Sequence, residues 1–334
     1  MNSITDNLPV GAAASSDTLS LMLRQVRYEA QGINSYELIH PLGEELPPFE
    51  AGAHIDVHIR PGLVRQYSLC NSPAERHRYV IGVLQDKQGR GGSKALHEQF
   101  RVQESYAVSA PRNHFSLQEQ ATHSILIAGG IGITPLKAMA HALEAQGKSF
   151  ELHYCARTAA SLAFRDELES WEQAGRAQIH LDNGNPDNGL DLKALLKEVR
   201  DGAHVYYCGP QGFMQACADA AQHWPDGTVH FEHFQAPVAA ASSNIEAGAF
   251  VAKIASTGQE ITVGASETLS DALANAGVTI PTSCVSGLCG TCKVNYLSGE
   301  VEHQDYILNP SEQSQSLTAC VSRGKSGTVL VLDL

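Results

Sequence analysis

Four cysteines near the C-terminal end of the chain have the spacing of iron-sulfur ligands. Cys284, Cys289 and Cys292 are separated by four and by two residues, and Cys320 follows after 27 intervening residues. This is the spacing of plant-type [2Fe-2S] ligands. Because two irons need four thiolates around a compact core, three must come from one tight loop, which glycines allow to wrap closely. The alternatives are four buried thiols, or a zinc site, which would more naturally contain two C-x2-C pairs where this chain has one.

A second group of residues has the composition of a phosphate site. The sequence RQYS, residues 65–68, closes an apolar strand pattern, and GGS, residues 91–93, opens a later helical stretch. A phosphate binds fixed cations and backbone N–H groups, which an arginine and a glycine-rich helix start can supply. The simpler interpretations are ordinary surface and core side chains on a strand, and a hairpin turn at the glycines.

Two further segments each lead from an apolar strand through a glycine turn into a helix. In the first, the strand SILIA runs into GGIGITP, residues 129–135, where Thr134 is predicted to cap the helix and Pro135 to occupy its first position. Such a turn aims backbone N–H groups and the helix dipole at a pyrophosphate. Pro135 departs from G-x-G-x-x-G, so a tight turn without a ligand is the alternative. The second segment is YYCGPQGFM, in which Cys208 by itself is more often a buried thiol.

The composition fits a folded protein of two or three domains. The chain has 334 residues, of which 43% are hydrophobic and 18% charged, and this excludes global disorder. Its 23 basic and 36 acidic residues give a net charge of −13, so nucleic acid and anionic membranes are not expected as partners. No apolar run reaches the roughly 18 residues of a membrane helix. The N-terminus lacks the pattern of a signal peptide, so we expect a loose tail on a cytoplasmic protein.

Changes in the hydrophobic pattern divide the chain into three predicted domains. After a tail of residues 1–18, short and partly alternating strands predict an antiparallel β-barrel for residues 19–120. Strands alternating with helical stretches, such as PLKAMAHALEAQG and LKALLKEVRDG, predict an α/β domain with a parallel sheet for residues 121–235. Residues 236–248 read as a linker. The last domain, residues 249–334, contains the four clustered cysteines.

The remaining cysteines and histidines carry no metal pattern. Cys70, Cys155 and Cys217 are predicted to be core thiols. The 15 histidines contain no H-E-x-x-H spacing, and the nearest pair, His230 and His233, is interpreted as a surface feature at a strand end.

Taken together, these segments resemble one family. Residues 249–334 resemble a plant-type ferredoxin domain of β-grasp fold. R-x-Y-S-L with its glycine turn resembles the flavin barrel of the ferredoxin-reductase superfamily. Three further segments resemble the nicotinamide-binding half of that superfamily: GGIGITP, ARTAASLAFRDEL and YYCGPQGFM. The domain order is similar to that of the phthalate dioxygenase reductase family. The resemblance implies flavin contacts for Arg65, Tyr67, Ser68, Gly82, Val83, Gly91, Gly92, Ser93 and Phe234. It implies nicotinamide contacts for Gly129, Gly130, Gly132, Arg157, Gly209 and Pro210, and catalytic positions beside the nicotinamide for Thr134 and Cys208.

The resemblance also implies cofactors, an electron path and a partner. FMN is favoured over FAD and NADH over NADPH, although Arg157 can meet a 2′-phosphate and no acidic residue is expected at its strand end to bind a ribose hydroxyl. NADH gives two electrons as hydride and the cluster accepts one at a time, so a flavin must stand between them. By resemblance, electrons then pass to the terminal oxygenase of a two-component Rieske-type system, and the reductase alone is a monomer.

Other functions stay open at this point. A free-standing flavin, ferric or ferredoxin-type reductase would treat the cluster as accessory, and a reductase for another oxygenase class would serve a different partner. A non-enzymatic electron carrier would need only the ferredoxin domain. From residue 236 onward, four basic residues stand against nine acidic ones, which predicts an acidic docking face for the partner.

Overall fold

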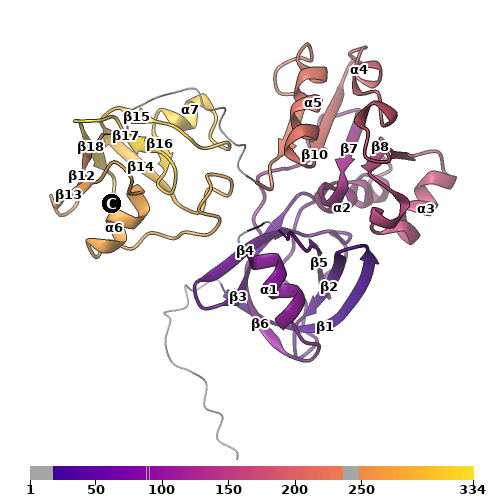
Figure 1. The fold of residues 1–334 in the computed structure, drawn as a ribbon, viewed down its shortest axis with the longest axis horizontal. Coiled ribbons are helices and arrows are strands. Elements are labelled where there is room, and N and C mark those ends of the chain that lie inside the picture. Colours follow the sequence, from indigo (N-terminus) through magenta and orange to yellow (C-terminus); the bar gives the residue numbers. More distant parts are fainter. Residues whose placement is uncertain (1–17, 88, 90, 236–247) are drawn as a thin grey trace, which may run out of the picture.

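The structure, a computed structural model, describes all residues except 1–17, 88, 90 and 236–247. The described residues form three units, each built on its own main sheet, that follow one another along the chain (Figure 1). Almost all of the predicted tail and linker lies outside the described residues. Among the described residues, no helix is long and apolar enough to cross a membrane.

The first unit is a six-stranded antiparallel sheet, as predicted. An isolated bridge between Leu69 and Ile81 brings its two edges together into a barrel. The sequence pattern missed the second strand, INSYELI, whose apolar residues do not alternate; hydrogen bonds to both of its neighbours hold it in place. The elements are β1 (Thr18–Ala30), β2 (Ile33–Ile39), β3 (His54–Arg60), β4 (Leu63–Ser68), β5 (Tyr79–Leu84), α1 (Gly92–Gln99) and β6 (Ser105–Ser109), with strand order β4-β3-β6-β1-β2-β5.

The second unit is a five-stranded parallel sheet with helices on both faces, which is the predicted α/β arrangement. Its strand order is β11-β10-β7-β8-β9. The strands are β7 (His123–Gly129), β8 (Ser149–Ala156), β9 (Ala177–Leu181), β10 (Ala203–Cys208) and β11 (Val229–Glu232), and the α-helices are α2 (Ile133–Ala145), α3 (Arg165–Gln173), α4 (Leu192–Leu195) and α5 (Gln211–Ala221). The helix predicted over LKALLKEVRDG is only four residues long, because after Leu196 its side chains face solvent and none reaches the core.

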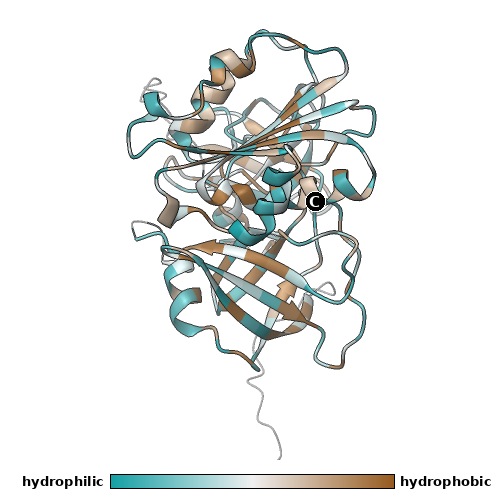
Figure 2. Ribbon diagram, turned by 90° about the vertical axis from the view of Figure 1, so that its right-hand side faces the viewer, coloured by the Kyte–Doolittle hydropathy of each residue, from teal (hydrophilic) through white to brown (hydrophobic). Residues whose placement is uncertain are grey.

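The third unit is a mixed sheet packed against one short helix, the predicted β-grasp arrangement. The sheet order is β13-β12-β18-β14-β16, and apolar residues of the helix α6 complete its core. The elements are β12 (Phe250–Ile254), β13 (Glu260–Val263), α6 (Leu269–Asn275), β14 (Lys293–Ser298), β15 (Val301–Glu302), α7 (Pro310–Gln313), β16 (Ser316–Thr318), β17 (Arg323–Gly324) and β18 (Val329–Leu332). Figure 2 shows apolar residues along the strands of the sheets and polar residues along the connecting loops.

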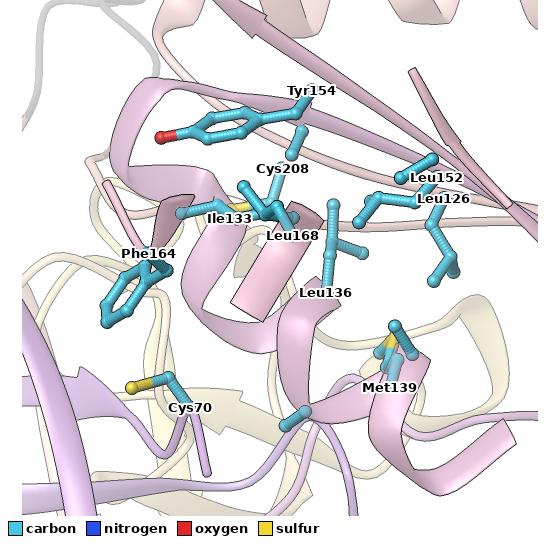
Figure 3. Packing of buried hydrophobic residues seen from close by; sticks show 14 of the residues in the cluster. Cys70, Leu126, Ile133, Leu136, Met139, Leu152, Tyr154, Phe164, Leu168 and Cys208 are labelled. Carbon is cyan, nitrogen blue, oxygen red and sulfur yellow. The ribbon is translucent and has the colours of Figure 1, made fainter. Parts of the chain in front are cut away.

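The first two units share one apolar cluster. Cys70 of the barrel lies near Phe164 of the second unit, and Cys208 lies deeper in the same cluster (Figure 3). A buried lysine fixes this contact: Lys137 Nζ donates to the Cys70 carbonyl at 2.9 Å, pairs with Glu167 at 2.6 Å and lies 4.8 Å from the centre of the Phe164 ring. The barrel and the parallel sheet are therefore held in one fixed relation at the point where their candidate site residues meet.

Candidate electron-transfer site

The four predicted cluster ligands come together in the third unit. Cys289, Cys292 and Cys320 are buried, and Cys284 is partly exposed. The thiols contact one another in pairs, Cys284 with Cys289 and Cys292 with Cys320, and Cys320 also reaches Cys284. The backbone N–H of Leu288 donates to the Cys284 sulfur at 3.4 Å, a contact that favours a thiolate.

The donor chemistry fits a two-iron cluster. In the described part of the chain, no three or more His, Cys, Asp or Glu side chains are arranged around a position for a single ion. A two-iron cluster instead spreads four thiolates over two metals, and here three thiols come from one loop and the fourth from beyond β16. The loop is also shaped to wrap closely. A Cβ atom at Gly287, whose φ is 71°, would lie 2.7 Å from the Val321 side chain and 3.1 Å from the Asp305 backbone.

The cysteine loop rests against the barrel. The ring of His114, in the chain that follows β6, is hydrogen-bonded to the backbone of Cys289 and would lie 3.6 Å from a Cβ atom at Gly290. Beside it, the carboxylate of Asp56 of β3 lies near the side chain of Ser283, the residue before the first ligand. The barrel is thus one neighbour of the cysteine loop, and the second unit is another, because the ring of His233 lies 5.9 Å from that of Tyr306.

The predicted phosphate residues form one cradle on the barrel. Gly91 caps α1 with φ 78° and without a side-chain hydrogen bond, so the first N–H groups of this eight-residue helix face outward. A Cβ atom at Gly92 would lie 2.5 Å from the Arg65 side chain. The side chain of Arg65 therefore lies directly over the start of α1. Ser93 Oγ accepts the Asp86 N–H at 3.0 Å and closes the loop. A fixed cation and a helix start together fit a phosphate group.

The predicted ring-contact residues lie between this cradle and the second unit. Ser68 is buried at the end of β4, and burial raises the pKa of the neighbouring Tyr67, which therefore remains a neutral phenol. Val83 packs inside the barrel core, so only its backbone is available to a ligand. A Cβ atom at Gly82 would lie 2.8 Å from the Thr134 methyl group and 2.9 Å from the Phe164 ring, so the two units approach most closely at this glycine.

Glycines also allow the strand ends of the second unit to meet. A Cβ atom at Gly132 would lie 2.1 Å from the Cys208 carbonyl oxygen, and one at Gly209 would lie 2.6 Å from the Phe213 ring. Gly129 faces the same ring at 2.8 Å, and Gly130 has φ 55°. These contacts exclude larger residues and leave the backbone of both turns open toward a bound ligand.

The prediction that Thr134 caps the helix is wrong. Residues 130–132 form a 3-10 turn that runs directly into α2, whose cap is Gly132, so Thr134 and Pro135 already lie within the first helical turn. The Thr134 hydroxyl donates to the Ile131 carbonyl at 3.0 Å instead of accepting an N–H group. Pro135 is tolerated because the first four N–H groups of a helix have no partner within it.

The other nucleotide residues lie at the carboxyl ends of the strands. Arg157 directly follows β8 and is exposed, and Pro210 caps α5 after β10. An acidic residue follows the adjacent strand β9. The N–H of Asp182, after the adjacent strand β9, donates to the Ala156 carbonyl at 3.2 Å, and its carboxylate accepts the N–H of Gly184 at 2.7 Å. Parallel pairing brings this residue in from a distant part of the sequence.

Phe234 lies just after β11 and is 38% exposed, while Phe231 is 44% exposed. Neither side chain is therefore packed in the core. Two expectations fail in the same region. Cys155 is only partly buried, unlike Cys70 and Cys217, and His230 is not a surface feature, because its ring stacks on Tyr206 and hydrogen-bonds His204 at 2.9 Å.

Sequence reasoning missed Glu232, the last residue of β11. Its Oε2 accepts a hydrogen bond from the Ser68 hydroxyl at 3.4 Å. The buried thiol of Cys208 lies close enough that an ionised Glu232 raises the pKa of that thiol. Burial raises the pKa of Glu232 to about 8, against a smaller opposing effect of the Ser68 hydrogen bond. At neutral pH this side chain is a protonated acid where the barrel meets the parallel sheet. The sequence around Glu232, EHF, matches no known motif, so the sequence alone could not have identified this residue.

A phosphate cradle, paired glycine turns on a parallel sheet and a four-cysteine loop in one chain define a nicotinamide-dependent iron-sulfur electron-transfer oxidoreductase. The family model described as a 2Fe-2S iron-sulfur cluster binding domain matches residues 252–325, and that of the oxidoreductase NAD-binding domain matches residues 126–219. The tert-butanol monooxygenase / tert-amyl alcohol desaturase reductase subunit of Aquincola tertiaricarbonis is 52% identical over 324 residues, covering 95% of this chain and 96% of that protein.

Two solved structures extend the comparison over the whole chain. Phthalate dioxygenase reductase, described as a modular structure for electron transfer from pyridine nucleotides to [2Fe-2S], is 42% identical with a TM-score of 0.71, covering 95% of this chain and 98% of that one. An intact type IV self-sufficient cytochrome P450 monooxygenase is 34% identical with a TM-score of 0.87, covering 98% of this chain and 43% of that one. The chain belongs to the phthalate dioxygenase reductase family, which confirms the predicted fold class, the [2Fe-2S] and nicotinamide cofactors and the oxidoreductase activity.

Proposed function

We propose that the protein is the NADH-dependent reductase component of a two-component Rieske-type oxygenase, with FMN as its flavin. One observation carries the electron path. The barrel residue Ser68 meets Glu232 of the nicotinamide unit, which lies near Cys208, while the barrel residue His114 is bonded to the backbone of the cluster loop at Cys289. The barrel, and with it a bound flavin, therefore stands between the nicotinamide and the cluster.

The chain's residues would act on the cofactors in the following way. Arg65 and the start of α1 at residues 91–93 would hold the flavin phosphate, while Tyr67, Ser68 and the Gly82 backbone would border its ring. Phe234 would cover the open side of the ring until the nicotinamide arrives. Bound FMN accepts two electrons as hydride and releases them singly. We favour FMN over FAD because the family resemblance and the single phosphate cradle both support it.

For the nicotinamide, the turns at residues 129–132 and 208–210 would bind the pyrophosphate and orient the ring over Gly82. Thr134 and Cys208 would contact the ring from the two strand ends. Asp182 supports NADH, because its carboxylate can accept a ribose hydroxyl and would repel a 2′-phosphate.

The flavin cradle has a direct test. A single charged contact to a phosphate contributes about 1.5–3 kcal/mol, so Arg65→Met should weaken flavin retention by about tenfold to a hundredfold. Arg60, exposed at the end of β3, provides the matched control Arg60→Met. Flavin released on dialysis is measured by absorbance, and chromatography of that flavin distinguishes FMN from FAD. Equal retention in both variants would contradict the assignment of Arg65.

The nature of the electron acceptor follows from the relatives. The Aquincola protein is the reductase subunit of a monooxygenase, and phthalate dioxygenase reductase serves a dioxygenase. The acidic excess from residue 236 onward supports docking on a basic surface of the oxygenase. The test is NADH-driven reduction of a purified Rieske oxygenase component, followed at several salt concentrations. Transfer should slow as salt is raised, and a rate independent of salt would remove the acidic docking face from the proposal.

A second candidate acceptor is a cytochrome P450. The observation that favours it is the whole-chain superposition, which is better with the P450 monooxygenase, at a TM-score of 0.87, than with phthalate dioxygenase reductase, at 0.71. Anaerobic mixing of the NADH-reduced protein with a Rieske oxygenase and, separately, with a haem monooxygenase domain distinguishes the two. Rapid reduction of the haem but not of the Rieske centre would favour the second candidate.

A further inference from the structure

A buried carboxylate lies against the cysteine loop of the third unit. The side chain of Asp305, in the segment between β15 and α7, is 0% exposed. A Cβ atom at Gly287, which lies between the first two ligand cysteines, would be 3.1 Å from the Asp305 Cα atom and 3.5 Å from its Cβ atom. An aspartate is almost never fully buried unless it is paired, so its position beside the ligand loop calls for an explanation.

Neutral hydrogen-bond donors hold this carboxylate in place. Its Oδ1 accepts the backbone N–H groups of Leu308, at 2.8 Å, and of Ile307, at 3.2 Å. Its Oδ2 accepts the hydroxyl group of Ser322 at 3.5 Å. Bonds of this kind, in which the carboxyl group is the acceptor each time, favour its ionised form. The donors therefore fix a negative charge without neutralising it.

No lysine or arginine of the described residues compensates this charge. The one basic side chain of those residues within ion-pair distance is His303, whose Nδ1 is 3.6 Å from Asp305 Oδ2. That separation is longer than a hydrogen bond, and the buried Nδ1 has no hydrogen-bond partner among the described residues. The four lysine and arginine residues of this unit are engaged elsewhere: Lys253, Lys293 and Lys325 pair with glutamates, and Arg323 donates to backbone carbonyls.

The segment that carries Asp305 reaches both parts of the ligand set. The backbone N–H of Tyr306 donates to the Gly287 carbonyl at 3.1 Å, and the Gly287 backbone lies beside the Cys320 thiol. Ser322, which donates to the carboxylate, follows Cys320 by two residues and is 1% exposed. The charge therefore lies where the ligand loop meets the turn of the fourth ligand, at a place where little water can screen it.

A fixed negative charge at this place acts on the electron affinity of the cluster. Reduction by one electron adds one negative charge to a [2Fe-2S] cluster, and a nearby anion opposes that change. We propose that Asp305 is a positioning residue whose buried carboxylate lowers the reduction potential of the cluster. The reduced cluster is thereby a stronger electron donor. This effect depends on the cluster alone and not on which acceptor receives the electron.

The test measures the reduction potential of the cluster directly. Holoenzyme is titrated anaerobically with dithionite and mediator dyes at pH 8, where an ordinary histidine is neutral, and electron paramagnetic resonance reports the reduced cluster. Asp305→Asn removes the charge, while its amide can still accept the two N–H groups and bond the Ser322 hydroxyl. Its cluster should be reduced more readily by about tenfold, which is a rise of about 59 mV for one electron. Asp333→Asn, exposed just after β18, should titrate as the wild type.

A second variant separates the charge of Asp305 from its role in the fold. His303→Lys leaves the carboxylate in place and sets a permanent cation beside it, so the potential should rise in the same direction as in Asp305→Asn. The resonance signal of the cluster should keep its shape in both variants. A wild-type potential in Asp305→Asn would overturn the proposal. If Asp305→Asn fails to hold the cluster, His303→Lys decides, because a wild-type potential there would show that Asp305 only supports the loop.

Discussion

The hydroxyl of Ser68 lies 3.4 Å from the carboxyl group of Glu232, although 164 residues separate them in the chain. Ser68 ends a strand of the barrel and Glu232 ends a strand of the parallel sheet. The contact joins the predicted flavin site to the predicted nicotinamide site, and the cysteine loop lies nearby, because His54, the register partner of Ser68, packs against His114, which is bonded to the backbone of Cys289. Under the proposed function, hydride transfer and single-electron transfer would both take place at a flavin held beside this contact.

Loss of one cluster ligand should separate these two steps. In Cys289→Ser we expect NADH to reduce the flavin at the wild-type rate, while transfer to the oxygenase falls by on the order of a hundredfold or more, because the cluster needs four thiolates. Ferricyanide reduction measures the first step and oxygenase reduction the second. Cys155→Ser is the control, since this partly exposed thiol lies in the second unit away from the loop. Oxygenase reduction at the wild-type rate in Cys289→Ser would remove the cluster from the path.

The close approach at Gly132 predicts a specific sensitivity. In Gly132→Ala the new methyl group would lie 2.1 Å from the Cys208 carbonyl oxygen, so the two strand ends must move apart. We expect a loss of about 1–3 kcal/mol of stability and a clear rise in the dissociation constant for NADH. Gly212 in α5 has no atom within 4 Å of a Cβ position, so Gly212→Ala should be neutral or slightly stabilising. Thermal unfolding and NADH titration test both, and tight NADH binding in Gly132→Ala would contradict the geometry.

The contacts of the buried Lys137 predict that replacing this residue loosens the fixed geometry between the first two units. Lys137→Met should remove the bonds to the Cys70 carbonyl and to Glu167, at a cost of about 1–3 kcal/mol. Flavin reduction by saturating NADH should slow, while NADH affinity changes little, because Lys137 lies away from the nucleotide turns. Stopped-flow absorbance measures the rate, and Lys193→Met, exposed on α4, is the control. An unchanged rate would show that this lysine does not set the alignment.

The raised pKa of Glu232 predicts how stability depends on pH. A carboxyl group whose pKa is about 8 in the folded state and ordinarily 4.5 binds its proton more tightly in the folded state. Its contribution to the free energy of unfolding is therefore full below about pH 4.5 and is lost as the pH rises through 8. The wild-type melting temperature should therefore fall relative to that of Glu232→Gln between pH 5.5 and pH 8. Glu260→Gln, exposed on β13, should follow the wild type. A constant difference between wild type and Glu232→Gln would mean that Glu232 titrates normally.

The parts of the site that local sequence determines were predictable. The cysteine spacing and the glycine turns each lie within a few residues of one another, so their chemistry is visible in a single segment. Short strands likewise predicted the barrel, and the alternation of strands and helices predicted the parallel sheet, while the β-grasp fold of the last unit followed from the family resemblance.

Contacts made by the fold itself were not predictable. Glu232 and His54 meet across two domains, and Asp182 comes beside the end of β8 only because β8 and β9 are paired. Thr134 was predicted as a cap because a hydroxyl before a proline is a common helix start, yet the preceding turn is already helical. In each case tertiary packing, and not the local sequence, decided the outcome.

The central claim, that electrons from NADH cross the flavin to reach the cluster, is tested most directly by one measurement. The purified protein is titrated anaerobically with NADH and followed by absorbance and by low-temperature electron paramagnetic resonance. We expect one addition of NADH to bleach the flavin bands and also to produce the signal of a reduced [2Fe-2S] cluster. Flavin bleaching while the cluster stays oxidised would contradict it.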